Sequence, residues 1–207
     1  MIITLKKIMN LINSPNAPIY YYQYQGGKYE SIVYLKTISN EKQVEYKKLA
    51  EDEQKSYVSD SAEIYIPLIS VDFLAQVYKA SVSHDYPYTL KKVHNMVRVI
   101  QKDECTAVAL YMLLHELGHW VDFLRCGRKP YDFTMPDSDE ARRVHNNGNQ
   151  LQVKLSAKKS LSEEDHIELE NFIQQYYKIP FEKRANDYAD LHYREAYEIL
   201  KEHGFLE

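Results

Sequence analysis

The segment 115–119 constrains this chain more than any other feature, because it reads His-Glu-Leu-Gly-His inside the mainly apolar stretch 105–124. An apolar run of this length predicts a helix. Residues four apart share one face of a helix, so His115 and His119 can bind one Zn²⁺ through two imidazole nitrogens. Glu116 lies beside them and can take a proton from a water molecule that the metal activates. The alternative is an ordinary core helix, and the helical context favours the metal site.

A third ligand is expected, because catalytic zinc usually takes three protein ligands and a water molecule. The candidate is Glu182, in a predicted helix that begins with a proline. Glu182, Ala185 and Ala189 share one face, and the two alanines would let this helix approach the metal helix closely. The Asn186 carbonyl could accept the second ring N–H of a ligating histidine. Taken alone, this segment is also typical of an ordinary amphipathic helix with a solvated charged turn. Together with the histidine motif, it favours Glu182 as a metal ligand.

Asp122 competes with Glu182 for the third position, because it faces the same way as the two histidines. A helix rises about 1.5 Å per residue, so Asp122 lies roughly 10 Å along the axis from His115. That distance is too long for both to bind one ion. We therefore predict that Asp122 contacts a ligating histidine or a neighbouring backbone group, and that Glu182 is the ligand.

The composition indicates one compact domain over residues 1–207, with an N-terminal sheet and helix part to about residue 100 and a helical metal-site part after it. Apolar residues make up 44% and charged residues 27%, as in ordinary globular proteins. The net charge of −4, without a basic block, gives no indication of nucleic-acid binding. The longest apolar run, 107–114, is far shorter than a membrane span, and no signal peptide is evident. We expect a cytoplasmic protein without membrane contact.

The predicted fold class is α+β, with a small antiparallel N-terminal sheet followed by a mainly helical half that carries the metal helix. Strands are predicted at 19–24 and 29–37 as a hairpin around Gly26-Gly27, and at 62–69, where Pro67 suggests an edge strand. A loop is expected at 127–136. Helices are predicted at 1–11, 42–57, 71–81, 89–101, 105–124, 138–157, 163–177 (capped by Ser162) and 180–203.

With Glu182 joined to the histidine motif, the chain resembles the zincin metallopeptidases of the gluzincin type. Residues 182–189, Glu-Lys-Arg-Ala-Asn-Asp-Tyr-Ala, look like the E-x-x-A-[ND]-x-[FY]-A segment of the ImmA/IrrE-type peptidases, which cleave repressor proteins. A group of membrane peptidases shares that segment, but this chain has no predicted spans. Residues 115–122 also resemble the H-E-x-G-H-x-V-D of anthrax lethal-factor-type toxin peptidases. The resemblance covers about 105–125 and 176–193, and implies a zincin-like core and its metal chemistry.

The resemblance also implies a donor that stabilises the oxyanion of the reaction. In the lethal-factor-type peptidases this donor is a tyrosine a few residues before the glutamate ligand. Tyr176 and Tyr177 lie in that region here. Three further side chains compete for the role: His145, His192 and Tyr193.

The sequence therefore predicts a zinc-dependent endopeptidase that acts on a protein or peptide, with a regulator as the target that the ImmA/IrrE likeness suggests. One alternative is a regulatory or scaffold protein that binds metal without turnover, although a structural site has no need of a base such as Glu116. Another is a toxin-like effector protease, which the missing export signal disfavours. Two histidines and a glutamate also suit divalent ions other than zinc.

Overall fold

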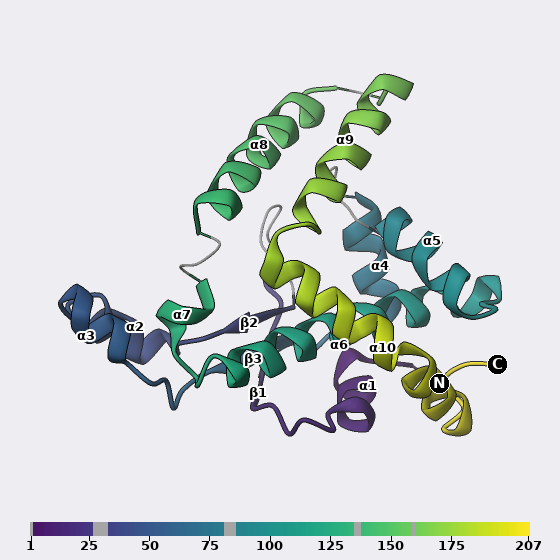
Figure 1. The fold of residues 1–207 in the computed structure, drawn as a ribbon. Coiled ribbons are helices and arrows are strands. Elements are labelled where there is room, and N and C mark those ends of the chain that lie inside the picture. The colour runs from purple at the N-terminus through teal and green to yellow at the C-terminus, as the bar shows by residue number, and fades with distance from the viewer. Residues whose placement is uncertain (1, 27–32, 81–85, 135–137, 159) are drawn as a thin grey trace.

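The computed structural model describes residues 2–26, 33–80, 86–134, 138–158 and 160–207. Its centre is the long helix α6 (Glu104–Arg125), and the last helix, α10 (Pro180–Glu202), packs along it (Figure 1). A three-stranded sheet and shorter helices surround this pair. The α+β class predicted from the sequence is confirmed at this level. Within the described ranges, no helix is both long and apolar enough to cross a membrane.

The remaining elements precede and follow α6 in chain order. They are α1 (Leu5–Ile12), β1 (Ile19–Tyr22), β2 (Tyr34–Lys36), α2 (Asn40–Tyr46), α3 (Glu51–Ser56), β3 (Glu63–Pro67), α4 (Val71–Ala80), α5 (Tyr86–Met96), a 3-10 turn (Gln101–Asp103), α7 (Pro130–Thr134), α8 (Ser138–Ser156) and α9 (Glu163–Tyr176). Four predicted helices are confirmed to within about two residues, the usual uncertainty of a helix end. They are the helices over 105–124, 138–157, 163–177 and 180–203, which correspond to α6, α8, α9 and α10.

The sheet differs from the predicted antiparallel hairpin. Its strand order is β1-β3-β2, with β1 parallel to β3 and β2 antiparallel to β3, so the two expected hairpin strands are not neighbours. The hairpin prediction is wrong for the described strands, and residues 27–32 of that segment lie outside the described residues. Ile64, Tyr65 and Ile66 are all buried, so β3 has apolar cover on both faces and takes the central position. Pro67 is the last residue of this central strand rather than a mark of an edge, and at a strand end its missing N–H costs little.

Further predictions are wrong in detail. The helix expected over 89–101 begins at Tyr86 and ends at Met96, and the helix expected over 1–11 begins only at Leu5. The single helix expected over 42–57 is split into α2 and α3, and the Glu53 carboxylate accepts the Ala50 N–H at 2.8 Å to start the second helix. Neither helix has a buried residue, so no packing holds them in one continuous rod. The loop expected over 127–136 contains α7, which begins at Pro130, a residue preferred in the first turn of a helix.

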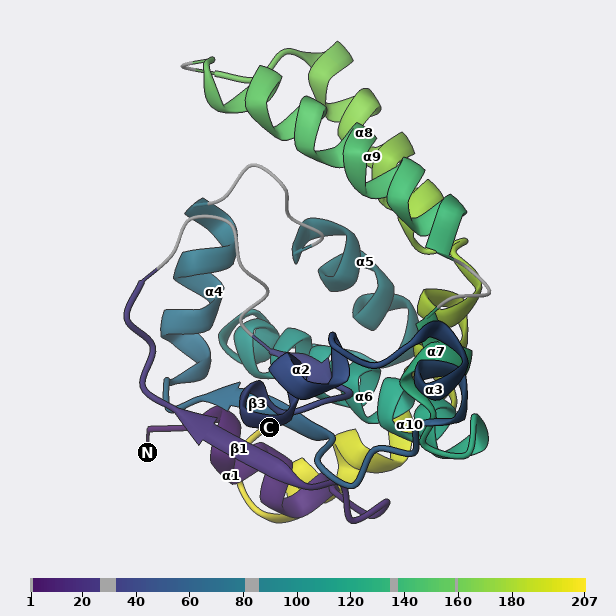
Figure 2. The ribbon, with the colours of Figure 1, turned by 90° about the vertical axis from the view of Figure 1, so that its left-hand side faces the viewer.

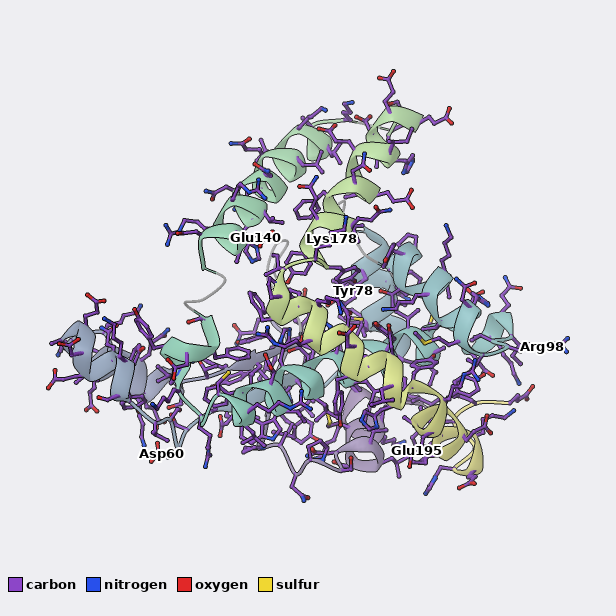
Figure 3. All side chains as sticks on the ribbon, in the orientation of Figure 1. Asp60, Tyr78, Arg98, Glu140, Lys178 and Glu195 are labelled. Atoms are coloured by element: carbon purple, nitrogen blue, oxygen red, sulfur yellow. The ribbon has the colours of Figure 1, made fainter. Side chains whose placement is uncertain are left out.

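The main core lies around α6, and side chains crowd between α6, α10 and the sheet (Figure 3). By contrast, α8 and α9 form a hairpin that extends away from this body in both views (Figures 1 and 2). Lys178, in the turn between α9 and α10, marks the point where the hairpin leaves the body (Figure 3). A small second cluster of Ala141, Val144 and Ile179 joins α8 to the start of α10. The hairpin is therefore anchored next to the helix turn that carries Glu182.

Candidate metal centre

His115, His119 and Glu182 converge from two helices. His115 and His119 lie one turn apart on α6, and Glu182 lies in the first turn of α10. The Nε2 atoms of His115 and His119 lie 3.2 and 3.4 Å from the same atom, Oε2 of Glu182. One ligand atom from each of the three residues lies within 4.8 Å of the other two. Glu182 and His119 are buried, with 4% and 7% of their surface exposed, so water competes little for these donor atoms.

The glycine between the two histidines makes this convergence possible. A Cβ atom on Gly118 would lie 2.7 Å from the carbonyl oxygen of Ala185 and 2.8 Å from its Cα atom, both on the backbone of α10. Only a residue without a side chain lets the helices approach this closely. Ala185 at this contact and Ala189 one turn later are both fully buried. In the sequence, the two alanines alone predict this close approach; Gly118 also indicates it, because it lies next to the histidines on the face of α6.

The three donor atoms fit a divalent cation. Ligands about 2.1 Å from a tetrahedral zinc ion lie roughly 3.4 Å from one another, close to the separations between Glu182 Oε2 and the two imidazole nitrogens. Despite these short distances, Glu182 Oε2 is buried without a hydrogen-bond partner among the described residues. Buried polar atoms are normally satisfied, so this oxygen calls for a positive partner, either a protonated imidazole in the metal-free protein or a bound cation. Two imidazoles and a carboxylate are a donor set that zinc prefers.

Asn186 contacts the ring nitrogen of His115 that faces away from Glu182. Its Oδ1 atom lies 3.1 Å from His115 Nδ1, which is the contact predicted from the sequence. The amide oxygen can accept the Nδ1 proton, which leaves Nε2 as the nitrogen that would bind a metal once its own proton is lost. For His119, Nδ1 has no hydrogen-bond partner in the described part of the chain.

Asp122 does not have the predicted role. Its Oδ2 atom accepts a hydrogen bond from Arg184 Nε at 2.8 Å, and no contact with His115 or His119 is seen among the described residues. The buried carboxylate therefore joins α6 to α10 two residues after Glu182. A long, flexible arginine from a distant helix satisfies it, and helical spacing within α6 gives no information on such a partner.

Glu116 lies beside the cluster but outside it. Its Oε2 atom accepts the backbone N–H of Leu35 in β2 at 2.8 Å, a contact that links residues 81 positions apart. Burial raises the pKa of Glu116, and the nearby Glu182 carboxylate raises it further, while the two histidines and the Leu35 N–H oppose the shift. A carboxylate with a raised pKa is a stronger base than an exposed glutamate.

The structure separates the two tyrosines predicted near the site. The Tyr176 hydroxyl donates a hydrogen bond to Glu182 Oε1 at 2.5 Å, so this tyrosine contacts the cluster directly. Tyr177 instead packs its ring against Tyr88 of α5, with centroids 5.2 Å apart.

The three competing side chains also have defined places. His145 of α8 packs against the Tyr176 ring at 5.5 Å, next to the cluster. Tyr193 donates its hydroxyl proton to the Ala107 carbonyl at 3.0 Å, inside the core. The His192 ring packs on Tyr188 at 4.3 Å.

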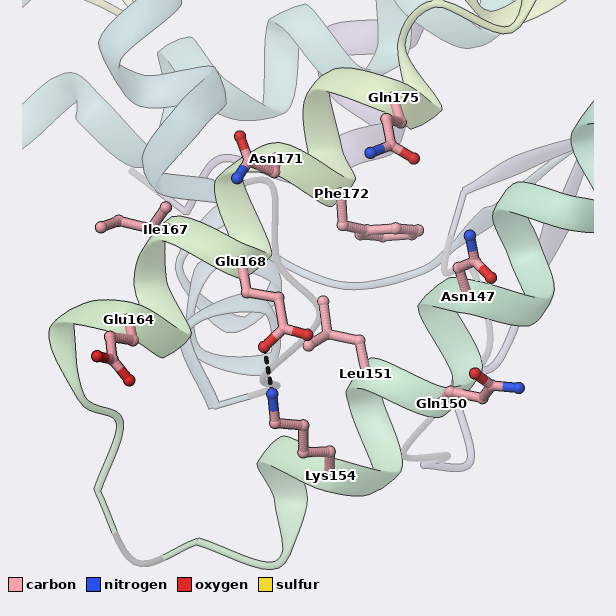
Figure 4. A pocket seen from close by; sticks show the side chains of 10 residues that line it. All are labelled: Asn147, Gln150, Leu151, Lys154, Glu164, Ile167, Glu168, Asn171, Phe172 and Gln175. Carbon is pink, nitrogen blue, oxygen red and sulfur yellow. Dashed lines mark hydrogen bonds and ion pairs between the residues drawn. The ribbon is translucent and has the colours of Figure 1, made fainter.

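An open groove of about 570 Å³ lies between α8 and α9, and none of its lining residues belongs to the metal cluster (Figure 4). Lys154 and Glu168 form an ion pair across it. Phe172 and Gln175 line the end of the groove nearest the cluster. Phe172 lies one helix turn before Tyr176, and Gln175 lies directly before it. The groove and the candidate metal centre are thus separate features, linked by the packing of Phe172 against the Tyr176 ring, with centroids 6.3 Å apart.

The ion pair in the cluster gives a pH prediction. Burial alone would lower the pKa of His115, but contact with the Glu182 carboxylate outweighs it and raises the pKa from 6.5 to about 9. Burial alone would raise the pKa of Glu182, but the two histidines lower it below its usual 4.5. The pair therefore stabilises the metal-free fold fully between about pH 4.5 and 6.5, and loses this contribution as the pH rises through about 9.

Zinc bound at this cluster would have to displace the His115 proton, so its effect would have the opposite pH dependence. We expect the zinc-induced rise in Tm, at fixed free zinc, to grow between about pH 6.5 and 9. Thermal unfolding with and without zinc measures it, with Glu182→Gln as the variant that should show little zinc effect at any pH. A zinc-induced shift of equal size across this range would show that no ligand proton is displaced.

Comparisons of the chain with protein families, with curated proteins and with solved structures find no match.

Proposed function

We propose that this chain is a zinc-dependent endopeptidase with a zincin-like arrangement, in which His115, His119 and Glu182 bind the metal and Glu116 is the general base. One observation carries the proposal: three donor atoms from two helices converge within 4.8 Å, while Glu116 stands beside them, outside the cluster. A site that only binds metal has no use for a neighbouring carboxylate with a raised pKa. The resemblance of the two motifs to gluzincin peptidases supports the same chemistry.

A divalent cation held by the three ligands would polarise the scissile carbonyl and lower the pKa of the attacking water. Glu116 would accept the proton of that water and pass it to the leaving amine. The Leu35 N–H holds one carboxylate oxygen, Oε2, and we assign the proton transfer to the other, Oε1. The buried setting strengthens both steps, because charges interact more strongly where water is excluded.

For the oxyanion we assign Tyr176 rather than Tyr177, because the Tyr176 hydroxyl already donates to a ligand carboxylate within the cluster. A hydroxyl in this place can turn from Glu182 to a negatively charged oxygen that develops beside the metal. His145, against the Tyr176 ring, would limit the directions in which that ring can move.

The proposed substrate is a protein, and the ImmA/IrrE likeness points to a regulator. We also propose a cytoplasmic location. Cys105 and Cys126 lie at opposite ends of the metal helix, about 30 Å apart on the rise of an α-helix, which is too far for a disulfide between them. Two cysteines without such a bond suit a reducing compartment.

A peptide library digested in H₂¹⁸O tests the proposed hydrolysis. We expect zinc-loaded protein to produce internal cleavages whose new carboxyl termini carry ¹⁸O, because water is the nucleophile. The same products should be missing after chelation and with His115→Ala, and should return when zinc is restored to the chelated wild-type protein. Cleavage that continues with His115→Ala would assign the activity to another site or to a contaminant.

A further inference from the structure

A chain of polar contacts leads from the metal cluster to the surface through three helices. The hydroxyl of Tyr111, one turn before His115 on α6, lies 3.1 Å from Asn186 Oδ1 and 2.8 Å from Asp190 Oδ1 on α10. Lys92 Nζ, on α5, lies 2.5 Å from the same hydroxyl and 2.8 Å from Asp190 Oδ1. Asn186 Oδ1 also accepts from His115 Nδ1. The contacts therefore form one continuous chain from Lys92 through Tyr111 and Asn186 to His115. Asp190 branches from this chain at Tyr111.

The chemistry of Lys92 gives this chain a direction. An ammonium group only donates, so the Tyr111 oxygen accepts from Lys92, and the hydroxyl proton goes to Asn186 or Asp190. When it goes to Asn186, the amide oxygen faces both Tyr111 and His115. Nδ1 of His115 then carries the proton, and Nε2 keeps the lone pair that faces the cluster.

The reverse direction would disable His115 as a ligand. The amide nitrogen of Asn186 has no hydrogen-bond partner within the described ranges, so the carboxamide is oriented through its oxygen. If Tyr111 gave its proton to Asp190, the amide could turn its NH₂ group toward Tyr111 and His115. His115 would then accept at Nδ1 and carry its proton on Nε2, the atom that must face the metal.

Lys92 disfavours this reverse arrangement in two ways. Its ion pair with Asp190 weakens the attraction of that carboxylate for the Tyr111 proton. Its N–H also occupies the Tyr111 oxygen, the atom that a reversed amide would need as an acceptor. Tyr111 is buried, with 3% of its surface exposed, so water does not readily replace either contact.

We propose that Lys92, acting through Tyr111, sets the direction of this hydrogen-bond chain and holds His115 in the tautomer that binds a divalent cation. Lys92 and Tyr111 are positioning residues, and Asp190 is a competing acceptor that Lys92 neutralises. This inference rests on the proposed metal site and adds that a residue outside the site, Lys92, influences its affinity for the metal.

The test is the Zn²⁺ affinity of the full chain, measured by competition with a chromophoric chelator. Lys92→Met keeps an apolar stem but loses the donor, and should bind zinc about tenfold more weakly, at the low end of the range for residues that orient a ligating histidine. Tyr111→Phe should weaken binding similarly, and Lys92→Arg should keep most of the affinity. Asp190→Ala removes the competing acceptor and should bind at least as tightly as wild type.

Lys183→Met is the matched control, because Lys183 forms an exposed ion pair with Asp187 on α10, 2.6 Å long, outside this chain of contacts. The zinc affinity of Lys183→Met should equal that of wild type.

The exchange rate of the His115 Nδ1 proton gives a second readout. In zinc-loaded protein with ¹⁵N-labelled histidine, the His115 Nδ1–H should exchange with solvent faster in Lys92→Met than in wild type. A purely structural ion pair would not produce this change.

Equal losses of zinc affinity in Lys92→Met and Asp190→Ala would overturn the inference, because both partners would then only support the fold. Unchanged affinity in Lys92→Met would also overturn it. Either result, with tight wild-type binding, leaves the proposed function intact. A wild-type chain that binds no zinc would instead remove the proposed function together with the inference.

Discussion

Glu116→Gln is expected to lower peptide hydrolysis by about 10²- to 10⁴-fold, the usual contribution of a general base, while zinc content stays at the wild-type level. The amide cannot accept the proton of the attacking water. It can still accept the Leu35 N–H through its oxygen, so the side chain should keep its place beside the cluster. Zinc binding should persist because Glu116 is not one of the three converging ligands.

The comparison requires a peptide that the wild-type chain cleaves, with the zinc content of each sample determined alongside kcat/KM. His115→Ala should lose both zinc and activity. Wild-type turnover by a zinc-loaded Glu116→Gln variant would rule out Glu116 as the base. Loss of zinc in that variant would mean that Glu116 contributes to the metal site itself.

Gly118→Ala should have the second large effect, on both stability and metal affinity. Its Cβ atom would lie 2.7 Å from the Ala185 carbonyl oxygen, against at least 3.4 Å for an ordinary contact. The two helices must separate by a large part of that difference, and metal ligands tolerate displacements of only about 0.2 Å. We expect about 1–3 kcal/mol of destabilisation from overpacking, reduced by up to about 1 kcal/mol because alanine favours a helix over glycine.

The matched control for this prediction is Gly148→Ala in α8. Its Cβ atom would lie 2.5 Å from the Phe172 ring, a contact that looks equally severe. Here the obstacle is the end of a side chain beside an open groove, so the ring can move. Gly148→Ala should therefore keep wild-type zinc affinity, whereas Gly118→Ala should lose most of it. Equal zinc affinity in the two variants would show that the approach of α10 to α6 does not control the site.

The parts of this molecule that could be predicted from sequence are those governed by local periodicity. His115 and His119 share a face because a helix has about 3.6 residues per turn, and α6 appears over the predicted range. Ser162 caps α9 as expected, since its hydroxyl accepts the Asp165 N–H. Glu182 is predicted as the third ligand because catalytic zinc usually takes three protein ligands and because Pro180 indicates where the last helix begins, and it lies beside both histidines.

The parts that escaped prediction depend on contacts between distant segments. The strand order β1-β3-β2 goes with burial of both faces of β3, by Ile64 and Ile66 on one face and Tyr65 on the other, which no turn signal encodes. The contact of Leu35 with Glu116 uses a backbone N–H, which every residue except proline has, so the sequence cannot single it out. The Arg184 partner of Asp122 lies 62 residues away along the chain.

The most direct test of the metal centre is a crystal structure of the zinc-loaded protein with anomalous data collected at the zinc edge. We predict one anomalous peak between α6 and α10, about 2.0–2.2 Å from His115 Nε2, His119 Nε2 and a carboxylate oxygen of Glu182. Neither Asp122 nor Glu116 should bind the ion directly. A map without a peak at this position, or with zinc held by Asp122 while Glu182 faces solvent, would contradict the account.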